Sequence, residues 1–180
     1  MNNQHMLHLC TGPTQGNAPQ PRNSIYLPIA VKPEISNGVS AESAVFAQLL
    51  VNDSRQEHGM LIWCQCLQAA AQWRCNDMIA GRYFAHCNSN GVCPNAVARA
   101  AGCKLPAEYA DRANSIESLA AGSPDPHTIL NSLIASPRHA DHLLGRNDFF
   151  RKQTHYAIGY AADRNSEYGF YWTILIAQCL

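Results

Sequence analysis

The chain has 180 residues, a mass of 19.8 kDa and 47% hydrophobic residues, which fits one folded domain and excludes wholesale disorder. Thirteen Lys and Arg balance thirteen Asp and Glu, so the excess positive charge of a nucleic-acid-binding protein is absent. The longest apolar run, 171–177, is too short for a transmembrane helix, and no membrane span is expected.

Residues 1–39 are rich in Asn, Gln, Pro and Gly and lack helical or strand periodicity over any useful length. They predict an irregular N-terminal tail, with one extended piece at 25–27, ahead of a folded domain over 40–180. Residues 1–22 show neither the basic region nor the apolar stretch of a secretory signal peptide. A trimmed mature chain, another export route and a cytosolic protein are all compatible with this start.

Apolar residues at three- and four-residue spacing predict helices in the first part of the domain. The first is capped by Ser40 and ends at 58–59, and the second covers 66–80. Proline at the first helical position predicts three more helices, which begin at Pro94, Pro126 and Pro137.

The last two segments, 155–161 and 171–177, are rich in β-forming residues and are separated by the polar loop 163–169. They predict two antiparallel neighbours in a sheet. Because helices come first and strands last, the sequence predicts an α+β fold.

Eight cysteines occupy positions 10, 64, 66, 75, 87, 93, 103 and 179, and none forms a C-x-x-C pair. This even, scattered set predicts two or more disulfides formed in an oxidising compartment. Cys87 and Cys93 bracket the turn-rich loop 88–92 and are the candidate pair. Cys75, inside a predicted helix, is alternatively a small buried hydrophobe.

Three polar residues are candidates for a functional site. His139 lies near a predicted helix N-terminus, where the helix dipole disfavours the imidazolium and leaves a neutral ring suited to metal binding or proton abstraction. Glu117 has apolar neighbours and needs a polar partner if it is buried. His86 follows an aromatic pair, a setting in which a structural histidine is common. The two histidines and the glutamate could form a three-ligand zinc site with an open fourth position.

Three segments around these residues match known motifs. Tyr83-Phe84-Ala85-His86 is similar to an aromatic-x-His motif, Asn114-Ser115-Ile116-Glu117 to a segment with a cavity glutamate, and Ser136-Pro137-Arg138-His139 to a Ser-Pro-x-His motif. From Leu49 to Ala177 the chain keeps these motifs in order and resembles the CAP superfamily. This superfamily includes cysteine-rich secretory proteins, antigen 5 and plant pathogenesis-related proteins of class 1, and the resemblance is strongest to its bacterial, SCP-like branch.

The resemblance implies a three-layer α-β-α sandwich with a small antiparallel sheet and a cleft that holds His86, Glu117 and His139. Two departures from the family pattern concern this cleft. Ser118 stands in place of the asparagine that follows the glutamate, and Ser136 falls near the expected place of a second cavity acid.

We therefore expect a secreted CAP-domain binding module with a cleft formed by His86, Glu117, His139 and Ser136. In that interpretation His86 and His139 bind zinc or another divalent metal, or the cleft takes a small ligand or an extracellular partner. The alternative is a peptidase-like, metal-dependent hydrolase, in which zinc lowers the pKa of a bound water and Glu117 acts as the base. Binding is favoured over catalysis because no second acid is evident if Glu117 ligates the metal. In a third interpretation the histidines only form hydrogen bonds in a structural core.

Overall fold

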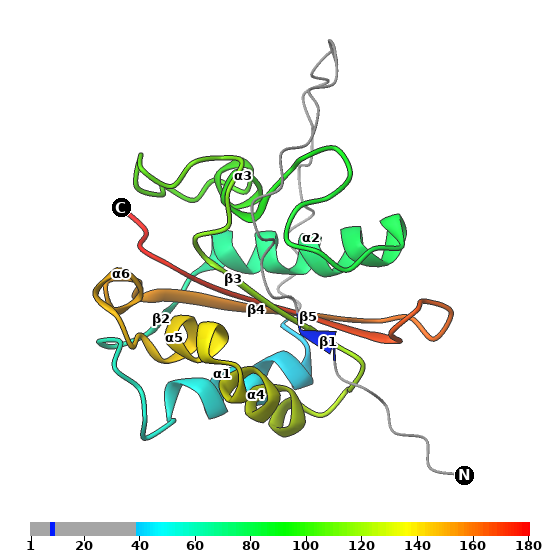
Figure 1. The fold of residues 1–180 in the computed structure, drawn as a ribbon, viewed down its shortest axis with the longest axis horizontal. Helices are drawn as coiled ribbons and strands as arrows, with labels where there is room; N and C mark the ends of the chain where they lie inside the picture. The colour runs from blue at the N-terminus through cyan, green and yellow to red at the C-terminus, as the bar shows by residue number, and fades with distance from the viewer. Residues whose placement is uncertain (1–7, 10–38) are drawn as a thin grey trace.

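The structure, a computed structural model, describes residues 8–9 and 39–180. In this part of the chain a five-stranded sheet with the order β1-β3-β5-β4-β2 lies between two layers of helices (Figure 1). The strands are β1 (His8–Leu9), β2 (Ile62–Trp63), β3 (Glu117–Ala121), β4 (His155–Ala162) and β5 (Phe170–Ala177).

The helices cover both faces of the sheet, which confirms the predicted three-layer α-β-α arrangement. One layer contains α2 (Gln65–Gly81) and α3 (Pro94–Ala100). The other contains α1 (Ala41–Val51), α4 (Pro126–Ala135) and α5 (Pro137–Leu144), and the short α6 (Asp148–Arg151) follows α5. Of the described helices, none is both long and apolar enough to cross a bilayer.

The sheet is mixed, whereas an antiparallel sheet was expected. β4 and β5 are antiparallel neighbours, as predicted, and β1, β3 and β5 continue this pattern. β2, in contrast, pairs with β4 in parallel.

Most predicted helices begin where the sequence places them, but α1 ends earlier than expected. The prediction extended it to 58–59, and the helix stops at Val51 with Asn52 as its C-cap. The carboxylate of Asp53 accepts the backbone N–H of Arg55 at 2.9 Å, a turn stabilised by an Asp side chain. This local hydrogen bond competes with continuation of the helix.

Two residues of the predicted tail belong to the sheet. His8 and Leu9 pair in antiparallel fashion with Ala121 and Ala120 of β3. The extended piece predicted at 25–27 lies outside the described residues.

A close approach of α2 to β4 depends on a glycine. A Cβ atom added to Gly159 of β4 would lie 2.3 Å from the backbone oxygen of Ala71 in α2. The absence of a side chain at this position therefore lets the helix pack directly on the strand. The same helix carries a buried stripe that includes Leu67, Ala70 and Met78.

Two disulfides join described residues, which confirms the prediction of two or more. Cys87–Cys93 is the predicted pair, and Cys66–Cys103 ties the first turn of α2 to the segment after α3. Cys75 is a fully buried free thiol in α2, in agreement with its interpretation as a small core residue.

Candidate functional site

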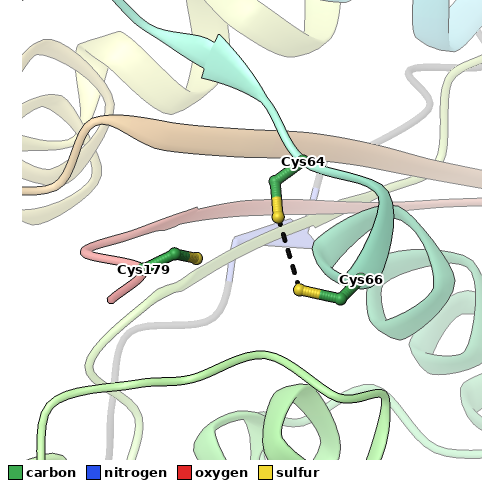
Figure 2. Close-up of side chains that lie close together, drawn as sticks. All are labelled: Cys64, Cys66 and Cys179. Carbon is green, nitrogen blue, oxygen red and sulfur yellow. Dashed lines mark hydrogen bonds between the residues drawn. The ribbon is translucent and has the colours of Figure 1, made fainter.

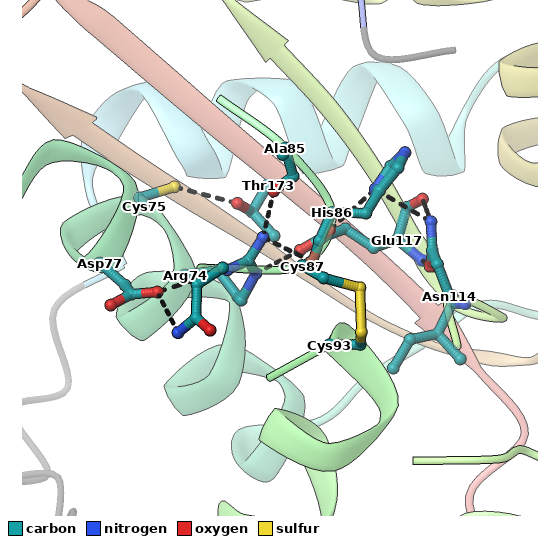
Figure 3. Close-up of polar contacts among 12 residues, drawn as sticks. Arg74, Cys75, Asp77, Ala85, His86, Cys87, Cys93, Asn114, Glu117 and Thr173 are labelled. Carbon is teal, nitrogen blue, oxygen red and sulfur yellow. Dashed lines mark hydrogen bonds and ion pairs between the residues drawn. A yellow bond between two sulfur atoms is a disulfide. The ribbon is translucent and has the colours of Figure 1, made fainter. Parts of the chain in front are cut away.

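Glu117, the first residue of β3, has a fully buried side chain with a partner for each oxygen. Its Oε2 accepts a hydrogen bond from Nε of Arg74 at 2.9 Å, and its Oε1 lies 3.0 Å from Nδ1 of His86 (Figure 3). Glu117 was expected to need a polar partner if buried, and it has two, Arg74 and His86.

Arg74 lies in the middle of α2 and is also fully buried. Its guanidinium donates to the backbone oxygens of Ala85 at 2.6 Å and His86 at 2.9 Å, and to the hydroxyl of Tyr83 at 2.6 Å. Burial alone would lower the pKa of Arg74, but the ion pair with Glu117 outweighs it and raises this pKa above its usual value. A permanently charged group thus fixes both the carboxylate and the loop that presents His86.

This loop is also held from its other end. Cys87, directly after His86, is bonded to Cys93 at the N-cap of α3. The side chain of Asn88 donates to Asp77 of α2 at 3.3 Å, and Asp77 also accepts a hydrogen bond from the Tyr83 hydroxyl. The backbone on both sides of His86 is therefore tied to α2.

Asn114 organises the turn that leads into β3. Its Oδ1 accepts the backbone N–H groups of Ile116 at 3.2 Å and Glu117 at 2.8 Å, and its Nδ2 donates to the backbone oxygen of Glu117 at 2.9 Å. The same Nδ2 lies 3.0 Å from Nδ1 of His86. This exposed amide thus borders the histidine from the solvent side.

The contact with Glu117 selects the tautomer of His86. An ionised carboxylate only accepts hydrogen bonds, so in this contact the proton of a neutral imidazole lies on Nδ1 and the lone pair on Nε2; the Asn114 amide nitrogen, itself a donor, then only borders this Nδ1. Figure 3 shows the second ring nitrogen pointing away from the Glu117–Arg74 pair. The His86 side chain is 12% exposed, which makes it the accessible member of the pair.

His139 is the third residue of α5 and is buried, with 5% of its surface exposed. Ser136 is the half-buried N-cap residue of α5, without a side-chain capping hydrogen bond. One turn after His139, the fully buried His142 places Nδ1 2.7 Å from the hydroxyl of Ser118. Sequence reasoning thus located the start of α5 correctly but missed the histidine within it that contacts β3.

Burial also sets the charge of His142. Its pKa is lowered to about 3, mainly because the ring is fully buried.

The predicted metal ligands His86, Glu117 and His139 do not all lie within 4.8 Å of one another. Among the described residues, one group of three His, Cys, Asp or Glu side chains has all its ligand atoms within 4.8 Å of one another, and it is Cys64, Cys66 and Cys179. His86 and Glu117 are in direct contact, but with His139 they do not form such a group.

Sequence reasoning missed Arg74, although a signal was present. Arg74 falls within the apolar stripe of α2, between Ala71 and Met78 and next to Cys75. A charged residue on a buried helix face requires a charged partner. That requirement could have linked α2 to an acidic residue in an apolar segment, such as Glu117.

Comparisons with known proteins concern the fold. No protein-family model and no curated protein sequence matches the chain. An extracellular protein with an SCP domain from Bacillus anthracis superimposes with a TM-score of 0.58 at 19% identity, over 76% of this chain and 40% of that protein. An outer surface protein from Borrelia burgdorferi gives a TM-score of 0.53 at 16% identity, over 76% of this chain and 91% of that one. The chain therefore has the CAP/SCP-like fold that its motifs indicate.

Proposed function

We propose that this protein is an extracellular or surface-exposed SCP-like binding module in which His86 and His139 bind a divalent metal such as zinc, or a small ligand in its place. The observation that carries the proposal is the Glu117–His86 contact, with Arg74 behind the carboxylate. Histidines that ligate metals usually donate their other ring N–H to a carboxylate, which fixes the tautomer and the ring orientation. Glu117 and Arg74 provide that arrangement for His86.

The donor set suits zinc chemistry. Neutral imidazole is a preferred ligand of zinc, and two histidines leave positions for water or for a donor group of a ligand. In this proposal Glu117 orients His86 and does not itself ligate the metal. His139, buried near His142, is the second imidazole of the site.

An extracellular or surface location is supported by two observations. Two disulfides join described residues, and disulfides persist mainly in oxidising compartments. The two similar solved structures are an extracellular protein and an outer surface protein.

The geometry gives less support to the hydrolase alternative. A general base must reach the water that it activates. The Glu117 side chain is fully buried and its two oxygens contact Arg74 and His86, so a water has no direct access to it. A binding role requires no such access.

Zinc titration calorimetry tests the proposal. We expect the wild type to bind zinc near pH 7.5, and the double variant His86→Ala, His139→Ala to lose this binding. His127→Ala is the matched control, because His127 is exposed on α4 and outside the site. The affinity of the wild type should fall in acid, because protons compete with the metal for the imidazole lone pairs. Equal zinc affinity of the wild type and the double variant would leave only a structural role for the histidines.

A further inference from the structure

Cys64, Cys66 and Cys179 gather at one end of the sheet, outside the histidine site. Cys64 links β2 to α2, Cys66 lies in the first turn of α2, and Cys179 follows β5 (Figure 2). Their sulfur atoms all lie within 4.8 Å of one another, and Sγ of Cys64 is 3.3 Å from Sγ of Cys66. Cys66 is already bonded to Cys103, so four cysteines meet at this junction.

The backbone holds both unpaired cysteines of the junction in place. The N–H of Cys64 donates to the backbone oxygen of Tyr156 in β4 at 3.0 Å. Leu180, which follows Cys179, donates its backbone N–H to the backbone oxygen of Lys104 at 2.8 Å. Lys104 in turn follows Cys103 directly. Main-chain hydrogen bonds at Cys64 and beside Cys179 therefore hold the two thiols close to each other.

We propose that Cys64 and Cys179 form a third disulfide in the native protein, beside Cys66–Cys103. The oxidant is a disulfide, either a low-molecular-weight one such as oxidised glutathione or the active-site disulfide of a thiol oxidase. The Cys64 thiolate attacks one sulfur of this oxidant, which forms a mixed disulfide and releases one thiolate. The Cys179 thiolate then attacks Sγ of Cys64 and releases the second thiolate. The two protons lost by the cysteines end on the two released thiols, so one disulfide is reduced as one is formed.

The surroundings of Cys179 fit a structural bond better than a metal site. Metal ligation needs the thiolate, and Cys66 cannot supply one while it is bonded to Cys103. The third thiol among the described residues, Cys75, is fully buried and donates to Thr173 at 3.3 Å, away from this junction.

Tryptic peptides of the unreduced protein provide a direct test. The protein, secreted into an oxidising compartment, is denatured with iodoacetamide, digested and analysed by mass spectrometry. Cys64 and Cys66 share the peptide 56–74, Cys103 lies in 100–104 and Cys179 in 165–180. The proposal predicts one species in which all three peptides are joined. Peptide 165–180 in free, alkylated form would overturn the proposal, and so would its attachment to 100–104 alone.

A double variant then assigns the pairing within the joined species. In Cys66→Ser, Cys103→Ser the only sulfurs left at the junction are those of Cys64 and Cys179. We expect peptide 56–74 to remain linked to 165–180. Two alkylated peptides, or a stoichiometric metal ion that protects both thiols until a chelator is added, would refute the disulfide.

Thermal unfolding gives an independent readout. Cys64→Ser, Cys179→Ser and the corresponding double variant should lower Tm by the same amount, roughly 5–10 °C, because each removes the same bond. Cys179→Ser should also make Cys64 reactive to iodoacetamide. Cys75→Ala is the control: whatever its effect on Tm, it should leave the three-peptide species intact. Unchanged Tm values in both single variants would contradict the proposal.

Discussion

Nδ1 of His142 lies 2.7 Å from the hydroxyl oxygen of Ser118, so a fully buried imidazole joins α5 to β3 directly after Glu117. The backbone oxygen of His142 in turn contacts Nε2 of His58 at 2.9 Å. Desolvation lowers the pKa of both histidines, and that of His142 falls to about 3. Both rings are therefore neutral in the folded protein at neutral pH.

The first prediction is a loss of stability in acid that depends on His142. In the unfolded chain this histidine takes up a proton near pH 6.5, whereas in the folded protein it does so only near pH 3. Its contribution is fully present above pH 6.5 and is lost as the pH falls toward 3, by about 1.4 kcal/mol per pH unit. Urea denaturation between pH 4 and 7 should show a shallower slope for His142→Gln than for the wild type. His127→Gln, at an exposed position, should keep the wild-type slope, and equal slopes for all three proteins would contradict this prediction.

The second prediction concerns the buried ion pair. Arg74→Met should lower the free energy of unfolding by about 3–5 kcal/mol, because it leaves the carboxylate of Glu117 buried without its cation. Chemical denaturation measures this loss. The double variant Arg74→Met, Glu117→Gln should lose less than the sum of the two single variants, since the unpaired charge is gone.

Arg151 offers the control for this experiment. Its pairs with Glu57 and Asp148 are solvent-exposed, so Arg151→Met should cost less than about 1 kcal/mol. A similar cost for Arg74→Met would show that the buried pair does not hold the His86 loop.

The third prediction tests the contact between α2 and β4. Gly159→Ala should destabilise the protein by about 1–3 kcal/mol, because the new Cβ meets the backbone oxygen of Ala71 and neither element can move freely. Gly59→Ala is the matched control, because an added Cβ there meets nothing within 4 Å. Thermal unfolding of the two variants should therefore separate them clearly, and equal Tm values would argue against the close packing.

The fourth prediction concerns the N-terminal tail. A chain that starts at Val39 should keep its Tm within a few degrees, because the composition of 1–38 provides little apolar surface to bury and β1 contributes only two residues. A fall of more than about 10 °C would show that the tail stabilises the domain. Cys10→Ser in the full-length chain separates a disulfide from that residue as the cause.

The helices were predictable because local signals define them. Proline at the first helical position placed the starts of α3, α4 and α5, and the apolar stripe placed α2. β3 was missed because all five of its residues are buried, so the strand shows no alternation of polar and apolar side chains.

For the site, the sequence indicated which residues require partners but not which partners they find. Glu117 was expected to need one, and Arg74 lies 43 positions earlier in the chain. Ser118 and His142 are likewise paired only by the packing of α5 on the sheet. Such pairs depend on tertiary contacts that no local pattern records.

The edges of the sheet influence whether copies of this protein associate with one another. Among the described residues, the edge strands β1 and β2 have two residues each, whereas the inner strands β4 and β5 have eight. A strand this short offers few unpaired backbone groups to a neighbouring molecule, which limits edge-to-edge association. Loss of β1 would add Ala120 and Ala121 to the unpaired edge of β3, which would then be a longer template. In the described part of the chain, β1 therefore shields Ala120 and Ala121 of β3 from a neighbouring copy, and this role is separate from its contribution to folding.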